Sequence, residues 1–167
     1  MGSAIQEFLD QFRHETEATR KILSVLTDEN MHRETDPGVR SLARMAWHIV
    51  QTLPEMAGRV GLKVRGPAET DPVPRHAEDI REAYALAARS LEEEIGKNWR
   101  DEDLERIDDM YGQKWPRRQS LRVLLNHEIH HRAQMTVLLR QAGAKVPGVC
   151  GPAREEWSAM GMPEPEI

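Results

Sequence analysis

The segment Arg118–Ala142, with the sequence RQSLRVLLNHEIHHRAQMTVLLRQA, is the most strongly patterned stretch of the chain. Its apolar residues recur every three or four positions, which predicts an amphipathic α-helix with one buried face. The members of this apolar stripe are Leu121, Leu124, Met135, Leu138 and Leu139. Gly143 follows the segment directly and is of the type that commonly ends a helix. We therefore predict a long helix here that packs against other helices.

Three further segments carry the same helical periodicity. The first helix is expected from about Ser3 to Leu26, and the third from about Arg75 to Lys97. The second begins after the turn Asp36-Pro37-Gly38, with Asp36 or Ser41 as its N-cap. Its apolar face consists of Leu42, Met45, Ile49, Leu53 and Met56. Strand-like alternation is absent from the sequence, so we expect no sheet.

The apolar stripe of the first helix is interrupted at its centre by Glu15, Thr16 and Thr19. A polar break in a core-facing stripe costs stability unless hydrogen-bond partners satisfy it. Two interpretations stay open. The three side chains face a polar cavity, or a slight rotation of the helix lets them reach water.

Four amphipathic helices that cannot each bury a face alone predict an all-α fold, a four-helix bundle. The acidic connection 98–116 is long, which favours a crossover between the third and fourth helices over a tight hairpin. A Pro/Gly-rich tail follows Ala144, with one short helical possibility from Arg154 to Met160. We expect residues 1–167 to form a single domain, with its core at about 3–143 and the tail at 144–167.

The composition narrows the class of protein. Of 167 residues, 39% are hydrophobic and 31% are charged, which is typical of a globular protein rather than a disordered one. A net charge of −5 argues against nucleic acid as a partner. No apolar run approaches the roughly 20 residues that cross a bilayer, so no membrane partner is expected. The single cysteine, Cys150, cannot form an internal disulfide, and we expect a cytoplasmic protein.

Two histidines of the Arg118–Ala142 segment share one helix face. His127 and His131 lie about 40° apart at about 100° per residue, so their imidazoles stack one turn apart. This spacing lets a helix offer two nitrogens to one metal ion. His48 lies at the edge of the apolar face of the second helix, in line with Arg44 and Thr52. If these helices are neighbours, three neutral imidazoles converge and leave a free coordination position, as in an open, catalytic metal site.

Several alternatives compete with this metal site. Two histidines four residues apart also occur on helices that bind no metal. The other four histidines are expected to lie apart from the site, with His130 turned away from the cluster and the rest exposed. Those remaining three are His14, His32 and His76.

The residues His127-Glu128-Ile129-His130-His131 also match His-Glu-x-x-His, the zinc metalloprotease signature with Glu128 as general base. The extended signature requires glycine and histidine where this chain has Gln134 and Val137. No strand is expected upstream to bind an extended peptide. Glu128 and Gln134 are therefore weak candidates for catalytic residues, both in a metalloprotease and in an open metal site of another kind.

Two segments resemble the DinB-like (damage-inducible) family of metal-binding four-helix bundles. Residues 41–49, SLARMAWHI, resemble the family's Ser-Leu-x-x-x-x-x-His-Ile stretch. Residues 127–134, HEIHHRAQ, resemble its His-x-x-x-His-x-x-Gln ending and continue as LLRQAG at 138–143. With the helix order, the resemblance covers most of residues 3–143.

The resemblance implies a divalent metal bound by His48, His127 and His131, with zinc or nickel as the default, and a homodimeric assembly. It also implies a small-molecule substrate, because characterised members of the family include metal-dependent transferases and isomerases that use low-molecular-weight thiols. Three functions stay open: a metal-dependent transferase or hydrolase, a non-catalytic metal- or ligand-binding protein, and a bundle with a vestigial histidine cluster. Ile129 and Val137, on the back of the fourth helix, favour a helix-to-helix dimer contact.

Overall fold

The computed structural model describes residues 2–34, 36 and 38–166. It contains the four long helices expected, which are α1 (Ala4–Leu23), α2 (Leu42–Arg59), α3 (Ala77–Asn98) and α4 (Arg117–Gln141). The four-helix bundle is therefore confirmed. Residues 1, 35, 37 and 167 lie outside the described part, and they include Pro37 of the expected turn and both ends of the expected domain. Ser41 caps α2, because its Oγ accepts the N–H of Arg44 at 3.2 Å.

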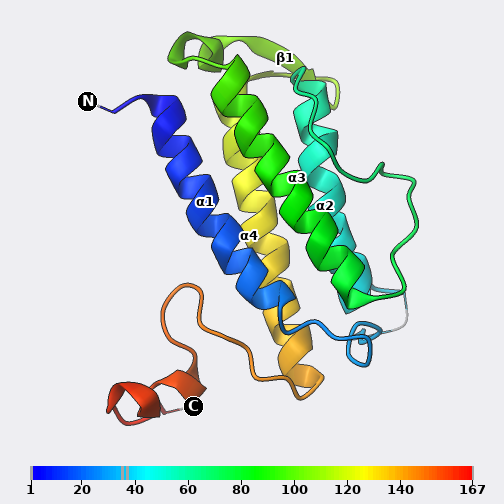
Figure 1. The fold of residues 1–167 in the computed structure, drawn as a ribbon, viewed down its shortest axis with the longest axis vertical. Coiled ribbons are helices and arrows are strands. Elements are labelled where there is room, and N and C mark those ends of the chain that lie inside the picture. The colour runs from blue at the N-terminus through cyan, green and yellow to red at the C-terminus, as the bar shows by residue number, and fades with distance from the viewer. Residues whose placement is uncertain (1, 35, 37, 167) are drawn as a thin grey trace.

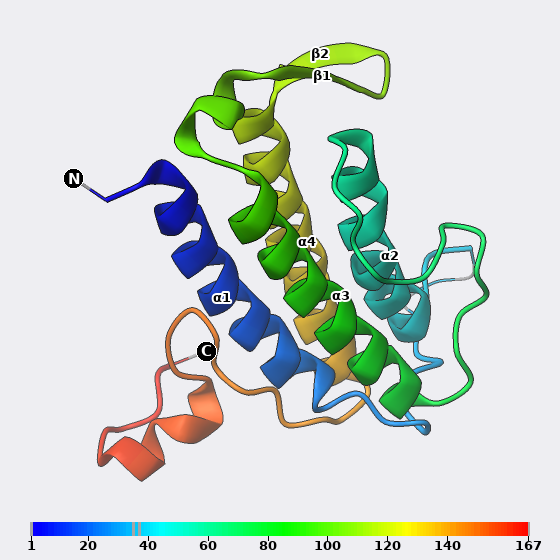
Figure 2. The ribbon, with the colours of Figure 1, turned by 45° about the horizontal axis from the view of Figure 1, so that its top comes forward.

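The helices form a ring in the order α1, α3, α2, α4, since α1 and α2 each pack against both α3 and α4 (Figure 1). At one end of the bundle, Asp101 accepts hydrogen bonds from the N-terminus of α1. At the other end, Asp28 accepts the N–H of Ala77 at the start of α3. In this ring α1 lies diagonally opposite α2, and α3 lies diagonally opposite α4. The α1–α2 and α3–α4 connections must therefore each cross an end of the bundle, which confirms the expected crossover between α3 and α4 (Figure 2). Helices α2 and α4 become direct neighbours as a result.

The α3–α4 connection contains a β-hairpin that the sequence analysis missed. A 3-10 helix, η1 (Asp101–Glu105), leads into the antiparallel strands β1 (Ile107–Met110) and β2 (Gln113–Pro116). Tyr111 and Gly112 form the turn, with φ values of 58° and 79°. The expectation of no sheet was wrong, because strands of four residues are too short for alternation to show, and β1 carries two aspartates. The hairpin lies across the end of the bundle, above α2 and α4 (Figure 2).

The chain after α4 turns aside at the lower end of the bundle and ends outside it (Figure 1). Val146 is buried, and Arg140 of α4 forms an ion pair with Glu155 at 2.6 Å. The expected short helix is present as two 3-10 turns, η2 (Arg154–Glu156) and η3 (Ser158–Met160). None of the helices in the described ranges is both long enough and apolar enough to cross a membrane.

Candidate metal centre

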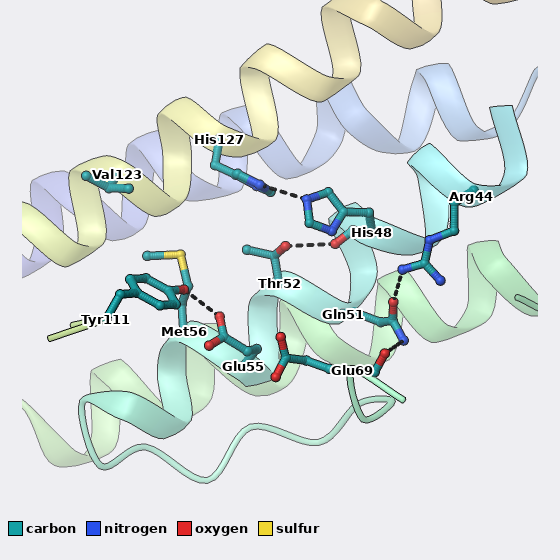
Figure 3. A pocket seen from close by; sticks show the side chains of 10 residues that line it. All are labelled: Arg44, His48, Gln51, Thr52, Glu55, Met56, Glu69, Tyr111, Val123 and His127. Atoms are coloured by element: carbon teal, nitrogen blue, oxygen red, sulfur yellow. Dashed lines mark hydrogen bonds between the residues drawn. The ribbon is translucent and has the colours of Figure 1, made fainter. Parts of the chain in front are cut away.

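Three imidazoles from two helices meet in the space between α2 and α4. His48 projects from α2, and His127 and His131 project from α4. Each offers one ring nitrogen, and the three nitrogens lie within 4.8 Å of one another. The Nε2 atoms of His48 and His127 are 3.0 Å apart (Figure 3). The ring centroids are 4.4 to 4.8 Å apart, and each pair is arranged edge to face. The structure thus brings together the three histidines singled out in the sequence.

This arrangement fits a divalent transition-metal ion. Zinc holds imidazole nitrogens at about 2.0–2.1 Å in tetrahedral geometry, which places any two of them about 3.4 Å apart. The His48–His127 separation of 3.0 Å is close to that value. Two neutral Nε2 atoms that face each other can form a hydrogen bond only if one of them carries a proton. A cation between them would instead accept the lone pairs of both nitrogens. The donor set, three imidazoles, suits zinc and nickel alike.

Burial keeps these rings neutral. Burial, followed by the positive charge of Arg40, lowers the pKa of His48 to about 4. Burial and the neighbouring His131 lower the pKa of His127 to about 4 as well. The pKa of His131 is also lowered, mainly by burial. Because a ring must be neutral to bind a metal, all three are in the ligand form at neutral pH.

Gln134 orients one of the three rings. The Nδ1 of His131 lies 2.8 Å from Gln134 Oε1, which can only accept, so Nδ1 carries the proton and Nε2 keeps a free lone pair. Metal-binding histidines commonly donate their second nitrogen in this way. His127 has no such support, since its Nδ1 is buried without a hydrogen-bond partner among the described residues. Gln134, a weak catalytic candidate from the sequence, thus contacts one of the three imidazoles directly.

Replacing Gln134 with alanine is expected to weaken zinc binding by about tenfold, the lower end of the range for loss of such a partner. Gln134 is exposed, so water can take over part of its function. Titration against a chromophoric chelator measures the change. Gln134→Glu keeps an acceptor at the same place and should retain wild-type affinity. Equal affinity in the alanine variant would mean that the contact orients nothing.

Glu128, a weak candidate for a catalytic residue from the sequence, lies in the core of the bundle. Its side chain is 1% exposed and accepts hydrogen bonds from Thr19 of α1 and Tyr84 of α3. No hydrogen bond joins it to an imidazole among the described residues. Glu128 is therefore placed in the core of the bundle rather than in the pocket.

The other histidines lie outside the three-histidine cluster. His130 is exposed, although its ring centroid is 5.0 Å from that of His131. His14 and His32 are exposed, and His76 binds Asp28 at 2.9 Å.

A pocket of about 370 Å³ opens beside His48 and His127 (Figure 3). Arg44 and Thr52 were expected along the line of His48 and do line this pocket. Glu69 and Tyr111 also line it but carry no sequence signal, because a loop and the undetected hairpin bring them there. The full lining is Arg44, His48, Gln51, Thr52, Glu55, Met56, Glu69, Tyr111, Val123 and His127.

The pocket has opposite charges at its two ends (Figure 3). At one end, Arg44 donates to Gln51 Oε1 at 2.5 Å, and Gln51 in turn donates to backbone carbonyls of the 60–76 loop. At the other end, Glu55 accepts from the hydroxyl of Tyr111 at 2.6 Å and pairs with Arg59. Besides burial, which has the largest effect, Arg44 is close enough to lower the pKa of His48 slightly, and Glu55 is close enough to act in the opposite direction on the pKa of His127.

Comparison with known proteins adds a family to this geometry. Residues 1–166 match the DinB family. The chain is 37% identical, over the full length of both chains, to an uncharacterized protein, YrdA, of Bacillus subtilis (strain 168). It resembles a DinB-like protein of Bacillus cereus at 43% identity and a TM-score of 0.84, covering 89% of this chain and 99% of that one. A DinB-like protein of Bacillus subtilis, at 18% identity, shares the fold with a TM-score of 0.67 over 86% of this chain and 96% of that one.

Proposed function

This chain belongs to the DinB family, and from its three converging imidazoles we propose that it binds one divalent transition-metal ion, zinc or nickel. The family resemblance drawn from the sequence is confirmed. The observation that carries the metal proposal is the convergence of three ring nitrogens within 4.8 Å. Their lowered pKa values supply ligands that need no deprotonation at neutral pH.

The adjoining pocket supports a reaction on a small molecule, and we propose either a metal-dependent transferase that uses a low-molecular-weight thiol or a metal-dependent hydrolase. A volume of about 370 Å³ is within the usual size range of small-ligand sites. A divalent ion held by three imidazoles would supply Lewis acidity that lowers the pKa of a thiol or water at the free position. Arg40 lies close enough to the imidazoles to lower their pKa values. Its positive charge, together with Arg44, would favour an anionic ligand such as a thiolate.

A second candidate is a protein that binds metal or ligand without turnover. One observation favours it: the carboxylates of Glu128 and Glu55 are already engaged. Glu128 is bonded within the core, and Glu55 is paired with Arg59 and Tyr111. The same observation gives no support to the metalloprotease interpretation. Its general base would be Glu128, which is 1% exposed and accepts bonds from Thr19 and Tyr84.

The metal proposal is tested by elemental analysis of protein purified without chelator. About one equivalent of metal per chain is expected in the wild type, with almost none in His131→Ala. The matched control is His130→Ala, one residue away and exposed, which should keep full metal content. Metal retained in the His131 variant, or absent from the wild type, would contradict the proposal.

Turnover separates the enzyme from the binding protein. Zinc-loaded protein is mixed with N-acetylcysteine and chlorodinitrobenzene, whose aromatic carbon forms a C–S bond as chloride leaves and the thiol proton passes to solvent. A rate above background that disappears in the His131→Ala variant supports the enzyme. A rate equal to that of buffer, with full metal content, favours the binding protein.

A further inference from the structure

A cluster of polar side chains lies in the core of the bundle, on a different side of α4 from the three histidines. We call it the buried polar cluster, and its members are Glu15, Thr19, Tyr84, Glu128 and Arg132. Glu128 and Arg132 are 1% and 2% exposed, and both Thr19 and Tyr84 are fully buried. Glu15 and Thr19 belong to the polar break in the stripe of α1, whose third member, Thr16, has a buried hydroxyl without a hydrogen-bond partner among the described residues. Glu15 and Thr19 face polar partners on α4, rather than an open cavity or water.

The cluster is joined by directional contacts across three helices. Arg132 of α4 pairs with the carboxylate of Glu15 at 2.5 Å and also donates to its carbonyl oxygen at 3.0 Å. Arg132 donates to Thr19 Oγ1 at 3.2 Å, and Thr19 donates to Glu128 Oε1 at 2.6 Å. The hydroxyl of Tyr84, on α3, donates to the same oxygen of Glu128. These contacts fix α4 against both α1 and α3.

Stability alone does not explain such a cluster. Removing charged and polar groups from water is costly, and well-packed apolar side chains of similar volume are often as stable or more so. Glu128 Oε2 has no hydrogen-bond partner among the described residues, which adds to the cost. The best-attested benefit of buried polar groups is a unique register between helices.

The cluster and the histidines are coupled by the geometry of α4. Glu128 follows His127 and Arg132 follows His131, so the two pairs form adjacent stripes about 100° apart on one helix. We infer that the buried polar cluster is a positioning device, which fixes the rotation and height of α4 so that His127 and His131 meet His48. This inference rests on the proposed metal function and assigns Glu128 a role other than catalysis.

The apolar contacts of α4 could not fix this register alone. Leucine and methionine side chains adapt to small shifts, and cores of similar volume tolerate rearrangement at small cost. A metal site does not tolerate such shifts, because its ligand distances are set to within about 0.2 Å. Directional hydrogen bonds to α1 and α3 supply the missing precision.

Glu128→Leu tests the inference, because leucine is of similar size but accepts no hydrogen bond from Thr19 or Tyr84. Zinc affinity, measured by competition with a chromophoric chelator, is expected to fall by about tenfold, within the range seen for residues that couple two sites. Glu128→Gln keeps the accepting oxygen and should bind zinc as the wild type does. Should Glu128→Leu not fold, Thr19→Val removes the hydroxyl that links Glu128 to Arg132, and the affinity should fall severalfold.

A stability control separates positioning from general loosening of the core. Ile95→Ala, in α3 and outside the cluster, is expected to lower the urea concentration at which half the protein unfolds while leaving zinc affinity unchanged. Wild-type zinc affinity in Glu128→Leu, or in Thr19→Val where the former does not fold, would overturn the positioning role while the metal site stands. An equal fall in Ile95→Ala would overturn it too. Failure of the wild type to bind zinc would overturn the proposed function and this inference together.

Discussion

Replacement of His48 by alanine is expected to weaken zinc binding by about a hundredfold. His48 is the single member of the three-histidine cluster that α2 contributes. Four-ligand zinc sites bind with about 10–16 kcal/mol, so one ligand contributes about 3 kcal/mol, which is about a hundredfold in Kd. Chelator competition gives Kd directly. Thermal unfolding gives a second measure of the weaker binding. Zinc at about 100 times the wild-type Kd stabilises the native wild type by about 2.7 kcal/mol, and the same zinc concentration should stabilise the weaker-binding variant much less.

The His48 variant distinguishes a three-histidine site from a site on α4 alone. His127 and His131 lie one turn apart and could bind a cation weakly without help from α2. In that case His48→Ala would leave both Kd and the zinc-dependent rise in Tm unchanged. His14→Ala serves as the control, because His14 is exposed on α1 and its loss should alter neither measurement.

Structural features that follow from a pattern repeated over many residues could be predicted from the sequence. Helix α4 is read from 25 residues of regular periodicity, and the structure places it within one residue of the expected bounds. The pairing of His127 with His131 depends only on helical geometry, so it could be predicted with equal ease. The approach of His48 required the further assumption that α2 and α4 are neighbours, which the crossover connections satisfy.

The rest of the site depends on contacts between segments that periodicity does not address. Tyr111 reaches the pocket through a two-residue hairpin turn, although a tyrosine at φ 58° departs from the Asn or Gly preferred there. The polar break of α1 was visible as Glu15 and Thr19, but their partners lie more than 100 residues away. The position of Glu128, beside His127 in the sequence, suggested a pocket role. Only the packing of α4 against α1 and α3 shows that it faces the core.

The metal-free protein is expected to lose stability as the pH falls from about 6.5 toward 4. His48 and His127 have pKa values of about 4 when folded, against about 6.5 when unfolded. Between these values the unfolded chain binds more protons than the folded one, so stability is complete above the unfolded pKa and declines below it. One pKa unit corresponds to 1.36 kcal/mol, so each ring contributes a loss of about 2 kcal/mol at pH 5. The two rings are coupled, and we expect a combined loss of about 3 kcal/mol.

Urea unfolding at pH 7 and pH 5, with chelator present, measures this loss. Both pH values lie above the pH at which carboxylates with a lowered pKa, such as Glu155 with a pKa of about 2, lose their contribution to the free energy of unfolding. His76→Asn is the control of opposite sign: Asp28 raises the pKa of His76, so its contribution is complete below pH 6.5 and is lost as the pH rises.

The double variant His48→Gln/His127→Gln should lose less stability than the wild type between pH 7 and pH 5, because it lacks two of the three rings whose pKa burial lowers. A wild type that is equally stable at both pH values would mean that these imidazoles take up protons freely in the folded state. Protons and a metal compete for the same lone pairs, so such rings would lose much of their ligand form in weak acid. The stability measurement therefore tests, without any metal present, whether the fold holds His48 and His127 as neutral ligands.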